Sequence, residues 1–242
     1  MEPATVFPPR LRIGILVFDG FEPLDVWGFT EAFTIARFVG TAYDDDNPRP
    51  FEVLFVSTER RGALDTPAPV RSFNGPRVAP DLFLDDAPSA RLDVLMIPGG
   101  LGVWALLSPS DAPALLEWVR EMDRTVQILA SVCTGAAVLA AAGVLDGRPA
   151  ATNHQAFASV TPYGPQVLWD NVSRWVDAGH YATSAGVSAG TDMGFYLVKR
   201  LCGRAVAETA ALAAEYDWHR DPEDPIRYPE GAEVPSSFDS MG

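Results

Sequence analysis

Short runs of almost continuous apolar residues recur through the chain, and each run ends at glycine, proline or polar residues. They cover residues 11–18, 51–57, 92–97 and 126–130. Runs of this length and composition are typical of strands buried on both faces, which occur mainly in parallel sheets. We therefore expect these four segments to be neighbouring strands of one buried sheet.

Segments with helical periodicity alternate with these runs. Apolar residues recur every three or four positions within residues 25–39 and again after Asp111, and further helical segments are predicted at about 191–201 and 204–218. Alternation of strands and helices predicts an α/β protein with a doubly wound, mostly parallel sheet. In such sheets, ligands bind beyond the C-terminal ends of the strands.

The chain shows no internal repeat and no convincing linker, so residues 1–242 are interpreted as one domain. Its core is expected to cover about residues 11–218. Residues 219–242 are rich in proline, glycine and acidic side chains. We expect this last segment to be mobile or to wrap around a neighbour.

Composition narrows the range of functions. Hydrophobic residues make up 48% of the chain and charged residues 21%, and the formal net charge is -14. A surface this acidic repels phosphate, which argues against nucleic acid as a partner. The chain has no apolar run long enough to cross a membrane and no secretory leader pattern at Met1, so we expect a cytoplasmic protein that does not bind membranes.

The most informative local pattern lies around Cys133. An apolar strand breaks at this cysteine and an alanine-rich helix follows, with Ser131 and Gly135 supplying small side chains at the bend. Such a strand-to-helix turn is typical of a nucleophile elbow, and the helix N-terminus is expected to favour the thiolate. The alternative is a small buried hydrophobic residue. Cys202 is interpreted as structural, because it ends an apolar helix.

Two other strand ends carry candidate site residues. Asp25 follows the first strand, and Gly99 and Gly100 follow the strand at residues 92–97. With Cys133, these residues are expected to meet at one edge of the sheet. Asp25 also stands at a helix start, where aspartate commonly caps the helix, and strand-end glycines commonly serve turns. The sequence shows no metal-ligand spacing, so no metal is expected.

Taken together, Leu24-Asp25, Pro98-Gly99-Gly100 and the run from Ser131 to Gly135 resemble the DJ-1/PfpI superfamily. The similarity extends from about Leu11 to Trp218 and is greatest to the isonitrile hydratase-like branch, which carries Leu-Asp and Val-Cys-Thr-Gly. Other branches place glutamate at the first position and often histidine after the cysteine. The resemblance implies a flavodoxin-like three-layer sandwich, a homodimer, no metal or organic cofactor, and addition of water to a small isonitrile.

The resemblance also implies roles for individual residues. Cys133 would form a covalent adduct with Asp25 as acid and base, and burial beside the sulfur is expected to raise the Asp25 pKa. Thr134 would assist them or simply cap the helix. Gly99 and Gly100 would bind substrate or developing charge. His154 would orient substrate or bond the backbone, although Asn153-His154-Gln155 departs from the Thr-His-Trp of that branch.

Two other interpretations are compatible with the sequence. The first is a cysteine-dependent hydrolase or glyoxalase-like enzyme, which the absence of histidine next to Cys133 disfavours. The second is a non-enzymatic sensor, in which Cys133 is oxidised or a ligand is bound. The acidic stretch after Trp218 does not have the pattern of the helix-turn-helix pair that related regulators carry.

Overall fold

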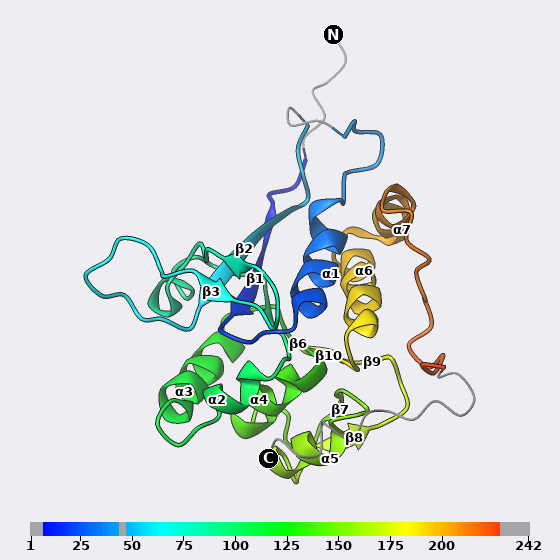
Figure 1. The fold of residues 1–242 in the computed structure, drawn as a ribbon. Helices are drawn as coiled ribbons and strands as arrows, with labels where there is room; N and C mark the ends of the chain where they lie inside the picture. The colour runs from blue at the N-terminus through cyan, green and yellow to red at the C-terminus, as the bar shows by residue number, and fades with distance from the viewer. Residues whose placement is uncertain (1–6, 44–46, 228–242) are drawn as a thin grey trace.

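A sheet with the strand order β2-β1-β5-β6-β10-β9 forms the middle layer of the protein in the computed structural model, which describes residues 7–43 and 47–227 (Figure 1). Its strands are β1 (Leu11–Val17), β2 (Phe51–Ser57), β5 (Val94–Ile97), β6 (Ile128–Val132), β9 (Trp175–Ala178) and β10 (Tyr181–Ser184). The pairs from β2 to β10 are parallel and β9 is an antiparallel edge strand. The expectation of a mostly parallel sheet is confirmed.

Two short pairs of strands lie outside this sheet. They are the antiparallel hairpin of β3 (Val70–Arg71) and β4 (Arg77–Val78), and the parallel pair of β7 (Pro149–Ala151) and β8 (Leu168–Asp170). The hairpin falls within the proline- and glycine-rich region between β2 and β5. Both pairs lie near the C-terminal ends of the parallel strands, where the candidate site residues gather.

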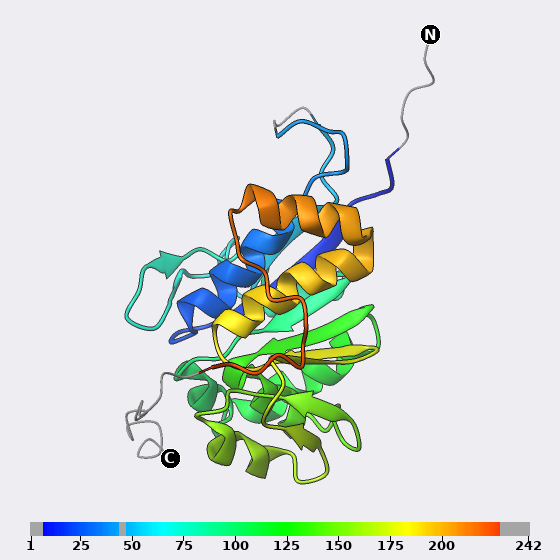
Figure 2. The ribbon, with the colours of Figure 1, turned by 90° about the vertical axis from the view of Figure 1, so that its right-hand side faces the viewer.

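Helices cover both faces of the sheet, which gives the three layers of a flavodoxin-like sandwich (Figure 2). The layer on one face consists of α1 (Pro23–Thr34), α6 (Ser188–Cys202) and α7 (Arg204–Ala213). The other face carries α2 (Gly102–Leu106), α3 (Ala112–Asp123) and α4 (Ala136–Ala141), and the short α5 (Phe157–Val160) follows β7. Short 3-10 turns cover Leu84–Asp86, Cys133–Gly135 and Thr161–Tyr163.

Apolar periodicity explains how the helices pack, but it misplaces several ends. Val26, Phe29 and Phe33 of α1 are buried, as the spacing predicts. The helix begins earlier than expected, at Pro23, because proline suits the first turn of a helix. Asp25 therefore lies inside the first turn, and its side chain points into the protein instead of capping the helix.

The segment after α7 is held against the domain by one buried carboxylate. Asp192 of α6 pairs with the Arg174 guanidinium at 2.9 Å and accepts a hydrogen bond from the Tyr216 hydroxyl at 2.9 Å. The backbone N–H of His219 donates to the same side chain at 3.1 Å. The segment expected to be mobile or to wrap around a neighbour thus contacts the domain at its first residue, His219, while residues 228–242 lie outside the described part of the chain.

Replacing Asp192 by alanine is expected to lower the free energy of unfolding by about 3–5 kcal/mol, because the buried Arg174 guanidinium loses its counter-charge. Urea unfolding followed by circular dichroism measures the effect. The matched control is Glu208→Ala, which removes an exposed pair with Arg204 and is expected to cost less than about 1 kcal/mol. Equal unfolding midpoints for the two variants would contradict this assignment.

Candidate active site

Cys133 sits at a sharp turn between β6 and α4. Its φ of 57° is uncommon for a residue other than glycine, and strained backbone of this kind is typical of functional turns. The Cys133 N–H donates to the Ala185 carbonyl at 3.3 Å, and the Thr152 hydroxyl donates to the Cys133 carbonyl at 2.9 Å. A Cβ on Gly135 would lie 2.1 Å from the Ile97 carbonyl oxygen, so glycine is required there. The predicted elbow is present.

A mostly apolar cavity of about 320 Å³ opens above the sulfur. Its lining residues are Glu22, Phe73, Gly100, Leu101, Trp104, Cys133, Thr134, Asn153, Ala156 and Val187. The Trp104 ring is stacked on Tyr163, with ring centroids 5.9 Å apart. A cavity of this size, with few polar groups, suits a small and largely apolar molecule.

Gly99 and Gly100 bring α1 and the elbow together. The Gly99 N–H donates to Asp25 Oδ2 at 2.8 Å, and the Gly100 N–H donates to Thr134 Oγ1 at 3.0 Å. A Cβ on Gly99 would lie 2.7 Å from the Thr134 nitrogen, and Gly100 has a φ of 120°. These hydrogen bonds position Asp25 and Thr134, and Gly100 also lines the cavity. Binding of substrate or developing charge by the two glycines stays a prediction.

Asp25 is fully buried, and its environment favours the neutral acid. Burial raises its pKa well above 3.8, the nearby charge of Glu22 raises it further, and the hydrogen bond from Gly99 opposes the rise. Oδ1 has no hydrogen-bond partner among the described residues. A proton on Oδ1 would therefore be free for transfer, while Oδ2 anchors the carboxyl group.

The surroundings of the Cys133 thiol disfavour its ionised form. Burial raises the pKa of this thiol, and a charge on Asp25 raises it further. The Asn153 amide and the backbone N–H groups of Thr134 and Val187 act in the opposite direction. Because burial has the largest effect, the net direction is opposite to the expected stabilisation of a thiolate by the helix N-terminus.

His154 is not among the residues that line the cavity. Burial lowers its pKa, while a hydrogen bond to the Ser173 backbone and the charge of Asp170 act against this decrease. Its Nε2 has no partner within residues 7–43 and 47–227. The structure therefore places His154 beside the loop that follows β8 and does not bring it to Cys133.

Most of the lining residues were not predicted from the sequence, and Asn153, Glu22 and Val187 are the most informative of them. Asn153 Nδ2 lies 3.1 Å from the Cys133 sulfur, and Asn153 Oδ1 accepts the N–H groups of Gln155 and Ala156, which fixes the amide. Asparagine before a short helix is a known turn signal, so the local conformation of Asn153 can be predicted from the sequence. Its contact with the Cys133 sulfur cannot. Glu22 and Val187 reach the cavity only through the fold, and Val187 has a φ of 30°.

The described ranges contain no group of three or more histidine, cysteine or acidic side chains arranged to hold a metal ion. None of the helices in these ranges is long and apolar enough to span a bilayer. Cys133 and Cys202 are both free.

A flavodoxin-like sandwich with a cysteine at its nucleophile elbow and a buried carboxyl group beside it defines the class of this protein. The DJ-1/PfpI family model matches residues 11–200. The chain is 35% identical to isonitrile hydratase of Pseudomonas putida over 209 residues, which cover 85% of this chain and 78% of that one. The chain belongs to the DJ-1/PfpI family.

Other relatives differ in function. The transcriptional regulator GbdR of Pseudomonas aeruginosa is 28% identical over 156 residues, covering 64% of this chain and 41% of the regulator. Among solved structures, a ThiJ/PfpI family protein from Pseudomonas syringae superposes with a TM-score of 0.70 at 24% identity, over 89% of this chain and 84% of that one. The fold is thus shared among proteins with different functions.

Proposed function

We propose that this protein adds water to a small isonitrile to give an N-substituted formamide, with Cys133 as nucleophile and Asp25 as acid and base. The observation that carries the proposal is the pairing of a buried thiol with a buried carboxyl group whose Oδ1 has no partner among the described residues. An isonitrile carbon must gain both a nucleophile and a proton, and this pair provides both. The similarity to the Pseudomonas putida enzyme supports the same reaction.

In the first step the sulfur attacks the terminal isonitrile carbon while the Asp25 proton moves to that carbon. A carbon–sulfur bond and a carbon–hydrogen bond form, and the carbon–nitrogen triple bond becomes a double bond. The proton lost by the thiol passes to the Asp25 carboxylate. The product is a thioimidate on Cys133, and Asp25 is again neutral.

In the second step water adds to the thioimidate carbon, and its proton moves to the nitrogen through Asp25. The carbon–sulfur bond of the resulting tetrahedral adduct then breaks. The sulfur regains a proton, and the carbon–oxygen bond becomes the formamide carbonyl. No step of this sequence is an oxidation or a reduction.

Thr134 and Asn153 assist by positioning. The Thr134 hydroxyl accepts the Gly100 N–H, and its own N–H together with the Asn153 amide acts on the sulfur. These donors favour the negative charge that the sulfur carries as it attacks and leaves. His154 is given no role in this mechanism, because the groups that act on its imidazole are the Ser173 backbone and Asp170. A homodimer is proposed from the family resemblance alone.

The site weighs against the oxidation form of the sensor interpretation, because oxidation of a cysteine depends on thiolate character and on exposure, and Cys133 has a raised pKa and only 6% exposure. The ligand-binding form of that interpretation stays an alternative. The hydrolase or glyoxalase interpretation lacks a histidine base at the sulfur, since Asn153 occupies that place.

The proposal predicts turnover of small alkyl or aryl isonitriles to N-formamides, without added metal or cofactor, measured by chromatography at neutral pH. In water labelled with oxygen-18 the formamide carries one label, and in heavy water its formyl carbon carries deuterium. Methylglyoxal is tested in parallel as the substrate of the competing interpretation. Absence of formamide from every isonitrile, with a folded protein and an intact thiol, would exclude the proposed reaction.

A further inference from the structure

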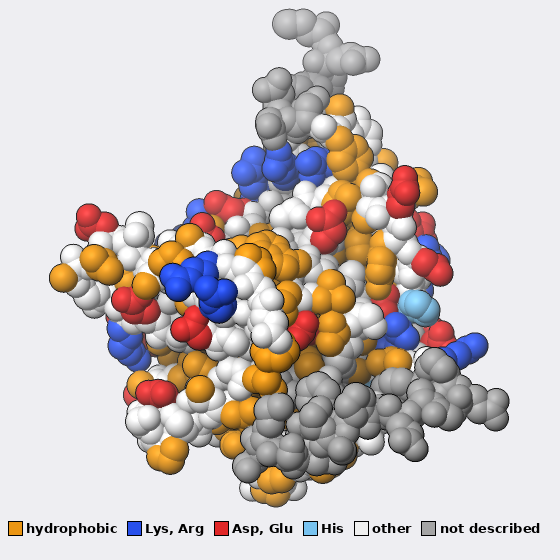
Figure 3. All heavy atoms as spheres, in the orientation of Figure 1, with side chains coloured by type: hydrophobic (Ala, Val, Ile, Leu, Met, Phe, Trp, Pro, Cys, Tyr) orange, Lys and Arg blue, Asp and Glu red, His pale blue; other side chains and the backbone are white. Residues whose placement is uncertain are grey.

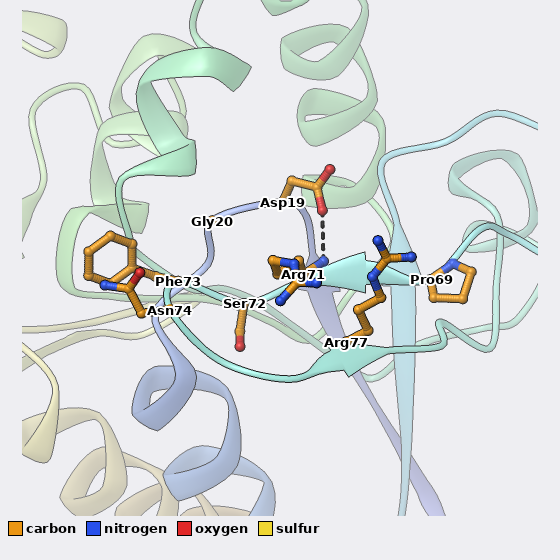
Figure 4. Close-up of a pocket in the computed structure, with 8 residues that line it drawn as sticks. All are labelled: Asp19, Gly20, Pro69, Arg71, Ser72, Phe73, Asn74 and Arg77. Carbon is orange, nitrogen blue, oxygen red and sulfur yellow. Dashed lines mark hydrogen bonds between the residues drawn. The ribbon is translucent and has the colours of Figure 1, made fainter.

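A second cavity of about 390 Å³ lies beside the first, and Phe73 lines both. It is formed by the β3–β4 hairpin and by the Asp19-Gly20 segment that follows β1 (Figure 4). Phe73 lies at one end of the row of side chains, Arg77 lies toward the other end, and Arg71 lies between them (Figure 4). A molecule bound at Cys133 and extending past Phe73 would therefore enter a region that carries two arginines.

These arginines are placed where their charges repel. Arg71 and Arg77 are directly opposite each other in the hairpin register, so both side chains stand on the same face. Arg71 donates only a long hydrogen bond, of 3.4 Å, to the Gly75 carbonyl. The Arg77 side chain has no hydrogen bond or ion pair within the described residues. Basic side chains gather over this hairpin at the surface (Figure 3).

The chain has 32 acidic and 18 basic residues, and several of its arginines, among them Arg12, Arg60 and Arg61, form ion pairs with acidic side chains. Within the described residues, neither Arg71 nor Arg77 has such a pair. The carboxylate of Asp19 also lines the second cavity, and its Oδ1 accepts the Arg71 backbone N–H at 2.7 Å. Two positive charges and one negative charge leave one positive charge, which suits a ligand group with a single negative charge.

We infer that the second cavity binds a carboxylate at the far end of the substrate. The guanidinium groups of Arg71 and Arg77 would each donate hydrogen bonds to it, and their mutual repulsion would be relieved. If the proposed function is correct, the preferred substrate is an isonitrile whose chain passes Phe73 and ends in a carboxylate. Glu22 lines the first cavity and repels a carboxylate there, which fixes the orientation of such a molecule.

The carboxylate site is tested separately from hydration, through alkylation of Cys133. The probes are N-alkyl maleimides that end in a carboxylate or in the matching primary amide, over a series of chain lengths. Peptide mass spectrometry separates modification of Cys133 from that of Cys202. After correction for reaction with glutathione, the carboxylate probe of best length is expected to modify Cys133 about tenfold faster at low salt, with a smaller ratio at high salt.

The variant Arg71→Gln/Arg77→Gln is expected to reduce this ratio to about one. Arg124→Gln/Arg204→Gln changes the net charge equally, at positions that line neither cavity, and is expected to keep the ratio. A ratio near one in the wild-type protein, or a high ratio in the Arg71/Arg77 variant, would overturn the inference.

The same comparison with isonitriles links the site to turnover. The isonitrile carboxylate is expected to have a kcat/KM about tenfold above that of its amide, mainly through a lower KM. Faster modification by the carboxylate maleimide without any isonitrile hydration would support the carboxylate site and exclude the proposed reaction. Hydration of isonitriles without any preference for the carboxylate over the amide would support the reaction and exclude the site.

Discussion

Replacing Cys133 by alanine is expected to lower kcat/KM for isonitrile hydration by at least about 10³-fold, to the limit of detection. The reason is that the reaction loses its nucleophile, and no other thiol lines the cavity. Alanine keeps the backbone turn and removes one buried atom, so the fold is expected to persist. Product formation by chromatography and unfolding by circular dichroism are measured on the same preparations.

Two further variants separate the thiol from its surroundings. Cys202→Ala is the matched control, because Cys202 is free and lies at the end of α6 away from the cavity, and it is expected to keep full activity. Cys133→Ser retains a small polar group but is expected to be nearly inactive, since a hydroxyl is a much weaker nucleophile than a thiol. Intact-protein mass spectrometry of the wild type after rapid quenching is expected to show a mass increase equal to that of the isonitrile. Substantial turnover by Cys133→Ala would remove the covalent mechanism.

Asp25→Asn is expected to lower kcat/KM by about 10²–10⁴-fold while the protein stays folded. An asparagine oxygen can still accept the Gly99 N–H, so the anchor of the side chain is kept. The amide cannot release a proton to the isonitrile carbon, and it cannot return as a base for water. Kinetics with the best isonitrile of the panel measure the loss, and the exposed Glu117→Gln serves as the control for carboxylate-to-amide replacement.

The Asp25 pKa also sets the pH dependence. Because this pKa is raised, the wild-type rate is expected to fall as pH rises through it and the proton donor is lost, and the residual rate of Asp25→Asn should lack this decrease. The folded state binds the proton more tightly than the unfolded state. The resulting stabilisation of the folded state is complete below pH 3.8, the ordinary pKa of aspartate, and is lost as pH rises through the folded-state pKa. Urea unfolding at several pH values should show this decrease in the free energy of unfolding with pH in the wild type and not in Asp25→Asn. The same pH dependence in both proteins would contradict a neutral Asp25.

The sequence predicted the sheet because its strands are buried on both faces. A segment such as β5, Val94–Ile97, is buried throughout and therefore needs apolar residues at every position, and this requirement is visible without any tertiary contact. The elbow was readable for a similar reason. A cysteine followed by Gly135 at a strand-to-helix junction is a local pattern, and the close approach of Gly135 to the Ile97 carbonyl shows why no larger residue fits.

Helix ends and segment mobility were less predictable. Apolar spacing within residues 25–39 indicates a helical face, but α1 ends at Thr34, with Ile35 as its C-cap. Residues 204–218 were expected to be helical, but α7 ends at Ala213. Residues from 219 onward were expected to be mobile or to wrap around a neighbour because of their composition, and the His219 N–H is bonded to Asp192, which is buried beside Arg174.

By itself the sequence determined the α/β class, the elbow at Cys133 and the place of Asp25 after the first strand, because each depends on a repeating or local pattern of residues, whereas the acid role of Asp25 was implied by the family resemblance. Only the tertiary structure decided the state and the neighbours of those groups. Burial raises the pKa of the Cys133 thiol. The fold uses the Gly99 and Gly100 N–H groups to position Asp25 and Thr134, and it brings Asn153, but not His154, to the cavity at the sulfur. These outcomes depend on which segments meet and how much water they exclude, and distances along the chain do not specify either.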